Sequence, residues 1–314
     1  MAEILRPMST GELMDRTLVL YKKNFKLFVG IAILGPASYL AFQLLTISSA
    51  TIQAGAGRRI NPFSAASLGF GFLAGIIIML AGIAIAHGAT VSAVAAVHLG
   101  FPITIVEAYK SLKGKIWRLL GVFVCMGLLA ALVAFLSVLL IAIVIVSLRS
   151  LFLHNRGGAA AALAVFMVFV PILIICISAM IVWIRYALAI ACCVVEDLGV
   201  VESLRRSVAL SQGSRFRIFL IYIVFLIVGM LLGAALGGLA GAAGTLIPNV
   251  MTRLILLYLA GFIGGSLTGP LATIGIALVY YDERVRKEAF DLQLMMSSLD
   301  LTAVSSGAAV PVQP

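Results

Sequence analysis

Few side chains of this chain have a type and position suited to chemistry. His87 is the one ionisable residue well inside a long apolar stretch, and Arg185 stands at the end of another. Ionisable side chains at membrane depth are costly and usually functional. We expect His87 to be neutral and hydrogen-bonded to a facing helix, with a proton relay or a ligand site as the alternative. Arg185 is expected to snorkel to the lipid head groups, or to pair with Glu196 or Asp197.

The reactive residues do not form the pattern of an enzyme. The sequence has neither an HExxH nor a GxSxG motif, and its 3 histidines and 4 cysteines match no zinc or redox spacing. We therefore predict no catalytic residue, no metal ion and no cofactor. The cysteines are expected to pack as small apolar residues.

Long uncharged stretches must position these side chains. Hydrophobic residues make up 63% of the chain and charged residues 11%, against about 45–50% and about 25% in soluble domains. About 20 mostly apolar residues are enough for one helix to cross a bilayer. The sequence therefore predicts an all-α membrane protein with six transmembrane helices. We place their hydrophobic cores at 27–48, 68–96, 119–147, 161–184, 218–244 and 254–280.

The positive charges are distributed unevenly between the two sides. Seventeen of the 22 Lys and Arg residues fall at the two chain ends or between spans 2 and 3 and spans 4 and 5. Positively charged loops stay in the cytoplasm, so we expect a multi-pass protein of the bacterial inner membrane with both termini cytoplasmic. The net charge of +10 indicates this topology and attraction to anionic lipid head groups rather than nucleic-acid binding.

A motif recurs ahead of spans 1, 3 and 5. Glu12, Glu107 and Glu202 are each 95 residues apart, and a basic residue follows each about one helical turn later. The interval predicts three repeats (9–98, 104–195 and 199–282), each with one amphipathic cytoplasmic helix and two spans. The helices should begin at the N-caps Ser9, Thr104 and Gly199. In the first helix, the apolar face is expected to carry Met14, Leu18 and Tyr21.

Basic residues of these helices are candidate contacts for phosphate-bearing lipids or for a protein partner. Their simpler role would be solubility and membrane topology. The candidates are Arg16, Lys110, Arg205, Arg206 and Arg217.

Small residues line the last two spans at intervals of four. This spacing lets helix backbones approach closely in a membrane, so spans 5 and 6 should form a tight antiparallel hairpin, with homo-oligomerisation as the alternative. Pro36, Pro171 and Pro270 should kink their helices, and such breaks can mark a transport pathway. The small residues are Gly229, Gly233, Gly237 and Gly241 in span 5, and Gly261, Gly265 and Gly269 in span 6.

The chain is expected to form one membrane domain over residues 1–296. Charges and apolar residues alternate through 282–296, which predicts a short interfacial helix at the end of this domain. Residues 297–314 lack a burial pattern and are expected to form a disordered cytoplasmic tail.

Three segments resemble one family. They read LRPMSTGELMDRT at 5–17 with LYKKNF at 20–25, VEDLGVVESLRRS at 195–207, and YYDERVRKE at 280–288. Together they resemble bacterial proteins classed with the glycerophosphoryl diester phosphodiesterase membrane domain. In full-length relatives the chemistry belongs to a separate soluble barrel, which needs about 200–250 residues. The resemblance therefore implies the membrane portion alone, with no catalytic residue carried over.

These observations favour a protein that is not an enzyme. We expect an integral inner-membrane protein that binds lipid head groups or a protein partner through its basic cytoplasmic helices. The alternative is a transporter or permease-like protein for amphiphilic or lipid-derived molecules.

Overall fold

The computed structural model of the protein describes residues 7–55, 62–154, 158–289 and 296. All regular secondary structure in these ranges is α-helical, as predicted. The helices are α1 (Thr10–Lys23), α2 (Phe25–Ala32), α3 (Leu34–Gly55), α4 (Pro62–His98), α5 (Ile105–Lys110), α6 (Ile116–His154), α7 (Gly158–Tyr186), α8 (Ala189–Val195), α9 (Val200–Ser211), α10 (Arg215–Thr245) and α11 (Val250–Glu288).

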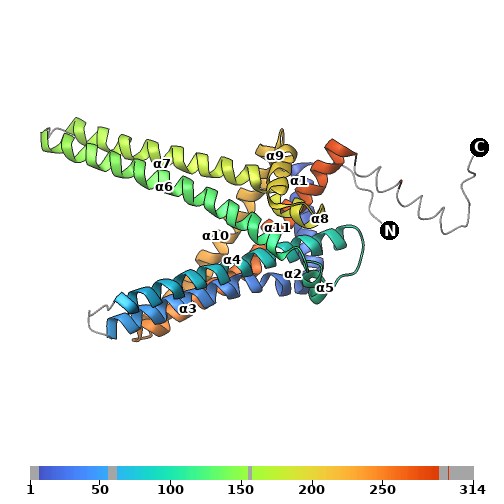
Figure 1. Ribbon diagram of the computed structural model, residues 1–314, viewed down its shortest axis with the longest axis horizontal. Helices are drawn as coiled ribbons and strands as arrows, with labels where there is room; N and C mark the ends of the chain where they lie inside the picture. Colours follow the sequence, from blue (N-terminus) through green and yellow to red (C-terminus); the bar gives the residue numbers. More distant parts are fainter. Residues whose placement is uncertain (1–6, 56–61, 155–157, 290–295, 297–314) are drawn as a thin grey trace, which may run out of the picture.

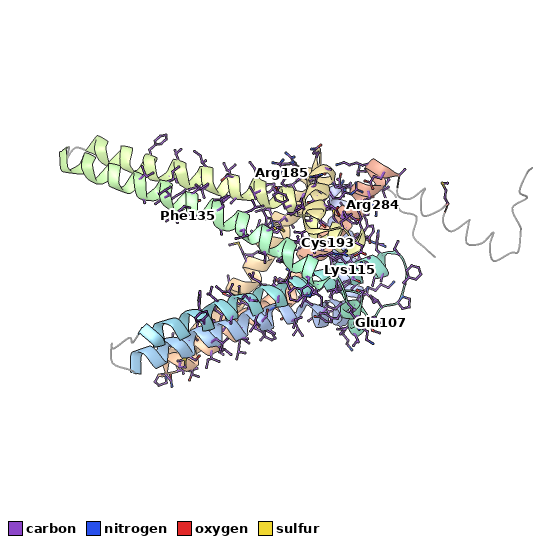
Figure 2. All side chains as sticks on the ribbon, in the orientation of Figure 1. Glu107, Lys115, Phe135, Arg185, Cys193 and Arg284 are labelled. Carbon is purple, nitrogen blue, oxygen red and sulfur yellow. The ribbon has the colours of Figure 1, made fainter. Side chains whose placement is uncertain are left out.

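Six segments of the described chain are long and apolar enough to cross a membrane, which confirms the predicted fold class. Their side chains face lipid over most of their length because there is too little protein around them to bury them. Phe135 on α6 is one example, with 65% of its surface exposed (Figure 2). The segments are Phe25–Ser48, Gly69–His98, Ile116–Ile143, Ile172–Val195, Arg215–Thr245 and Val250–Glu288.

The spans form three hairpins, α3–α4, α6–α7 and α10–α11, and together these make a forked molecule (Figure 1). Helices α3, α4, α10 and α11 pack side by side in one arm, while α6 and α7 form the other arm. The short helices α1, α5, α8 and α9 gather where the arms meet. We call this region the collar end. The buried core lies here, since α1, α5, α8 and α9 cover the inner ends of the spans.

The repeated motif forms three equivalent helix starts. The carboxylates of Glu12, Glu107 and Glu202 each accept a hydrogen bond from the backbone N–H three residues earlier. Hydrogen bonds from Thr104 lower the pKa of Glu107 below its usual value. Two positions in each repeat, again 95 residues apart, are fully buried; the second of them lies just after α5 in the middle repeat. These are Leu13, Ala108 and Ser203 at the first position, and Thr17, Leu112 and Ser207 at the second.

The apolar face expected for the first repeat helix is therefore rotated by about one position. Leu18 is exposed, and the small side chain of Thr17 is buried in its place. The Thr17 hydroxyl donates to the carbonyl of Leu13 within its own helix, so burying it leaves no unsatisfied donor. Close packing against α11 selects the small residue over the larger apolar one.

The prolines act differently from one span to the next. The first span is interrupted at Ile33, because Pro36 has no N–H to donate to the carbonyl of Ala32. Helices α7 and α11 continue through Pro171 and Pro270. Of the three prolines, Pro36 alone lies next to a break between two helices in the described residues.

The glycine stripes contact different neighbours. Helices α10 and α11 form the expected hairpin, and a Cβ built on Gly229 would lie 3.6 Å from the hydroxyl oxygen of Thr268. Gly233 of the span 5 stripe also lies against α11, because a Cβ built on Gly264 would lie 3.9 Å from its Cα. A Cβ on Gly265 would lie 3.2 Å from Cγ of Pro36 on α3, which places the span 6 stripe against the first hairpin. No neighbouring atom lies within 4 Å of a Cβ built on Gly237, Gly241, Gly261 or Gly269.

The end of the last span also differs from expectation. Residues 282–288 continue α11 without a break, so they belong to the span helix rather than to a separate interfacial helix. The helix ends at Ala289, which has a left-handed backbone conformation with φ 49°. Residues 290–295 and the predicted tail 297–314 lie outside the described residues.

Candidate functional site

Two carboxylates are buried at the collar end, and the sequence analysis did not identify either. The side chain of Asp282 is 0% exposed and that of Glu283 is 2% exposed. Arg217, in the first turn of α10, places Nη1 2.6 Å from Oδ2 of Asp282 and 3.5 Å from Oε1 of Glu283. Arg286 and Lys287, one turn further along α11, bind Asp282 and Glu283 respectively. Each buried anion is thus paired, as burial of charge requires.

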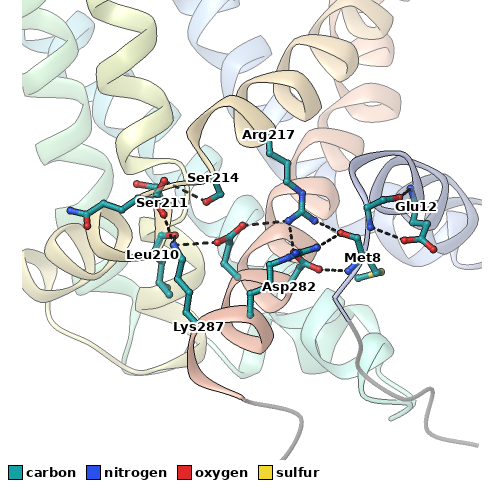
Figure 3. Close-up of polar contacts among 12 residues, drawn as sticks. Met8, Glu12, Leu210, Ser211, Ser214, Arg217, Asp282 and Lys287 are labelled. Atoms are coloured by element: carbon teal, nitrogen blue, oxygen red, sulfur yellow. Dashed lines mark hydrogen bonds and ion pairs between the residues drawn. The ribbon is translucent and has the colours of Figure 1, made fainter.

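The same cluster holds the start of the chain against the last helix (Figure 3). The backbone N–H of Met8 donates to Asp282, and the carbonyl of Met8 accepts from both Arg217 and Arg286. Lys287 donates to the carbonyl of Gln212, in the link between α9 and α10. The cluster therefore joins segments more than 200 residues apart in sequence.

A second ion-pair network surrounds Glu196, after α8. Its carboxylate lies 2.9 Å from Nε of Arg206 and accepts a hydrogen bond from the hydroxyl of Tyr280. Desolvation opposes the charge of Arg206, but hydrogen bonds and attraction from Glu196 and Glu288 outweigh it and raise the pKa of Arg206. The next residue, Asp197, pairs instead with Lys115 and Arg118.

These networks revise the role of several predicted site residues. Arg206 and Arg217 neutralise carboxylates of their own chain. Arg185 pairs with neither Glu196 nor Asp197, so that expectation is wrong; its side chain is exposed at the end of α7.

The other basic candidates lie at the surface. Lys110 and Arg205 are exposed, and Arg16 is half-buried on α1. The exposed side chains of Lys113, Arg205 and Arg215 form no ion pair within the described residues. A free cation is available to an external anion, whereas a paired one must first lose its partner.

Aromatic residues lie beside the free cations. Trp117 is 83% exposed and Phe216 is 72% exposed. Gln212, Gly213, Arg215 and Phe216 line a surface hollow of about 360 Å³, which we call the Arg215 hollow. Exposed aromatics next to basic residues are typical of the head-group level of a membrane.

An apolar cavity of about 460 Å³ lies between α6, α7 and α10. We call it the α10 cavity. On α10 it is lined by Phe219, Tyr222, Ile223 and Leu226, which fall on the helix face that begins at Arg215. The Arg215 hollow and the α10 cavity therefore follow one face of the same helix.

His87 lies deeper, between two further cavities. A cavity of about 300 Å³, the His87 cavity, is lined by His87, Phe123, Trp183, Tyr222 and Thr273 among other residues. A cavity of about 280 Å³, the Pro36 cavity, lies on the other side of His87, against Pro36 and the span 6 glycines. Nδ1 of His87 lies 2.9 Å from the hydroxyl oxygen of Thr273 on α11, which confirms the expected bond to a facing helix.

The lining of these cavities is apolar with a small number of polar groups, as in sites for small amphiphilic molecules. Within the described ranges, no group of three or more His, Cys, Asp or Glu residues is placed to hold a metal ion. Cys192 and Cys193 are buried in α8, consistent with a packing role.

No protein-family model, no curated protein and no solved structure matches this chain.

Proposed function

We propose that this multi-pass membrane protein is not an enzyme and binds anionic lipids at its collar end, which faces the cytoplasm. The resemblance to the glycerophosphoryl diester phosphodiesterase membrane domain belongs to this proposal, as does location in a bacterial inner membrane. The proposed orientation follows from the excess of Lys and Arg at the collar end. Anionic lipids of the inner leaflet attract basic residues there, each contributing about 1 kcal/mol.

One observation carries the proposal: the Arg215 hollow and the α10 cavity lie on one helix face. Arg215 supplies an unpaired positive charge for a phosphate group, and Phe216 sits beside it at head-group depth. Phe219, Tyr222 and Leu226 continue the face for 11 residues, or about 16 Å, beside an apolar cavity. A phospholipid has this same order of parts, with a charged head followed by an apolar chain.

The test compares two pairs of substitutions that remove equal charge. Arg205→Gln with Arg215→Gln removes two cations that form no ion pair in the described residues of the collar end, whereas Arg58→Gln with Arg59→Gln removes two positive charges from the sequence between α3 and α4. Native mass spectrometry would measure phosphatidylglycerol retained by each purified variant. Retention should fall about fivefold per charge in the first variant, since about 1 kcal/mol is lost for each.

The second variant should retain phosphatidylglycerol like the wild-type chain. Equal retention by all three proteins would overturn the proposal. Equal loss in both variants would also overturn it, because the effect would then follow net charge rather than the collar end.

A second candidate function is transport of amphiphilic molecules. The divergence of the two arms favours it (Figure 1), as do the cavities on either side of His87. Proteoliposomes would then move a fluorescent lipid between leaflets faster than protein-free vesicles. Equal rates would exclude this function for the lipid tested.

A further inference from the structure

The hydroxyl of Thr273 on α11 lies within hydrogen-bond distance of both His87 and the carbonyl of Gly269. The single hydroxyl proton of Thr273 can be donated to the carbonyl of Gly269, one turn earlier in α11, at 3.3 Å. The same oxygen lies 2.9 Å from Nδ1 of His87, where either atom can be the donor. When Thr273 donates its proton to the Gly269 carbonyl, its oxygen accepts from Nδ1–H of His87. In the neutral imidazole, Nε2 is then an acceptor with a free lone pair. It forms no hydrogen bond within the described residues.

Two more polar groups border the same space. Trp183 from α7 and Tyr222 from α10 line the His87 cavity, with their rings 6.1 Å apart. Neither the indole N–H nor the phenol hydroxyl bonds to another described residue. Trp183 is 43% exposed and Tyr222 is partly buried, and each ring carries a polar group that can bond to a ligand. The residues that line the cavity therefore include an imidazole, an indole and a phenol.

The rest of the lining determines the charge and the shape of a ligand. No Asp, Glu, Lys or Arg lines the His87 cavity within the described chain. An ionised head group would lose its hydration there without a counter-ion, which is strongly unfavourable. The remaining walls are apolar, formed by residues such as Ile83, Met126 and Ile276. A volume of about 300 Å³ is at the lower end of the range for small-molecule sites.

The depth of these groups matches an amphiphile rather than a free solute. His87 is 11 residues from His98 at the collar end of α4, or about 16 Å, which is near half the thickness of a hydrocarbon core. Tyr222 is five residues, or about 8 Å, from Arg217 at the collar end of α10. A molecule reaching the cavity at this depth comes from the bilayer itself.

We propose that the His87 cavity binds an uncharged amphiphile with a hydroxylated polar end, one hydroxyl donating to Nε2 of His87. Trp183 and Tyr222 bind the other oxygen atoms of that polar end, while the chain lies along the apolar walls. Monoacylglycerols and long-chain alcohols belong to this class. The free cations lie at the collar end and do not line this cavity, although Trp183 and Tyr222 line both it and the α10 cavity.

Trp183 makes the site directly observable. The chain has 2 tryptophans, and Trp117 is exposed at the start of α6, so a Trp117→Phe chain leaves Trp183 as the reporter. A monoacylglycerol brominated on its chain should quench Trp183 fluorescence saturably, and unlabelled monoolein should reverse the quenching. Methyl oleate has no hydroxyl donor and should compete about tenfold more weakly, the effect of one hydrogen bond.

Substitutions separate this site from general lipid contact. His87→Phe should raise the half-quenching concentration about tenfold. Thr273→Val removes the hydrogen-bond partner of Nδ1 of His87 and should raise the half-quenching concentration a few fold. Tyr39→Phe, in the neighbouring Pro36 cavity, is the matched control and should change nothing.

Several outcomes would overturn the proposal. Methyl oleate competing as well as monoolein would mean that the hydroxyl is not recognised. Unchanged quenching in a folded His87→Phe chain would show that His87 does not bind the polar end of the ligand. If the His87→Phe chain does not fold, unchanged quenching in the Thr273→Val chain would show the same. The Arg205→Gln, Arg215→Gln chain should bind monoolein normally, so this site and the collar-end site can fail separately.

Discussion

At the scale of single residues, Arg217 is the cation on which the buried carboxylates depend. Arg217 pairs with both Asp282 and Glu283, and each carboxylate keeps one other cation of α11 when Arg217 is removed. Loss of one partner of a buried ion pair costs up to about 3–5 kcal/mol. Arg217→Ala should therefore lower the thermal unfolding temperature in detergent strongly. Arg215→Ala, two residues earlier and without an ion pair in the described chain, should change stability by less than about 0.5 kcal/mol. Equal effects would show that Asp282 and Glu283 do not need Arg217.

Replacing the imidazole of His98 with a phenyl ring, by contrast, is expected to raise the unfolding temperature. Both its ring nitrogens are buried without a hydrogen-bond partner in the described residues, and the ring packs against Tyr281 at 5.4 Å. An unsatisfied buried polar group costs about 1–3 kcal/mol. His98→Phe keeps the ring contact and removes the unsatisfied atoms, so the unfolding temperature should rise. His98→Ala, which loses the ring as well, should lower it. A fall with His98→Phe would indicate a partner for the imidazole.

These residues also show the limit of sequence reading at this scale. His87 could be identified because a lone imidazole in an apolar run stands out, although its partner Thr273 could not be named. Asp282 and Glu283 were missed because they lie just past an uncharged run, where water is expected. Their burial comes from α1, α9 and α10, which are distant in sequence. The acid–base spacing of four to Arg286 and Lys287 was the available signal.

At the scale of helices, close packing is concentrated at glycines outside the predicted stripes. A Cβ on Gly82 of α4 would lie 2.4 Å from Cβ of Ser38 on α3, so the two backbones must separate to admit it. Gly82→Ala should destabilise the protein by about 1–3 kcal/mol. Gly237→Ala, with no neighbouring atom within 4 Å, should be neutral or slightly stabilising. Comparing the two unfolding temperatures tests this; a larger loss for Gly237→Ala would contradict it.

The positions of the helices could be predicted from the sequence, whereas the contacts between the helices could not. Lipid cannot hydrogen-bond the backbone, so a long apolar segment has to be helical. The three capped starts also followed from local chemistry, because the capping carboxylate lies three residues from its partner. A glycine stripe identifies a face that can pack closely but not the helix that will pack there. Gly265 meets Pro36 of the first hairpin for this reason.

At the scale of the whole molecule, the fork could not be derived from the sequence. Apolar side chains are equally suited to lipid and to a neighbouring helix, so hydropathy does not indicate where α6 and α7 leave the other spans (Figure 1). The sidedness could be inferred, because the charges of the connections differ. The C-terminal ends of α3, α6 and α10 and the N-terminal ends of α4, α7 and α11 all lie away from the collar end.

The predicted orientation of the protein in the membrane can be tested by labelling cysteines in spheroplasts. In a chain without its native cysteines, Leu246→Cys places an exposed thiol at the α10–α11 connection, and Lys113→Cys places one at the collar end. A membrane-impermeant maleimide should label Leu246→Cys in spheroplasts, because few positive charges hold that side in the cytoplasm. Lys113→Cys should react only after the membrane is permeabilised. The reverse pattern would place the collar end outside, where the anionic inner leaflet could not supply its ligand.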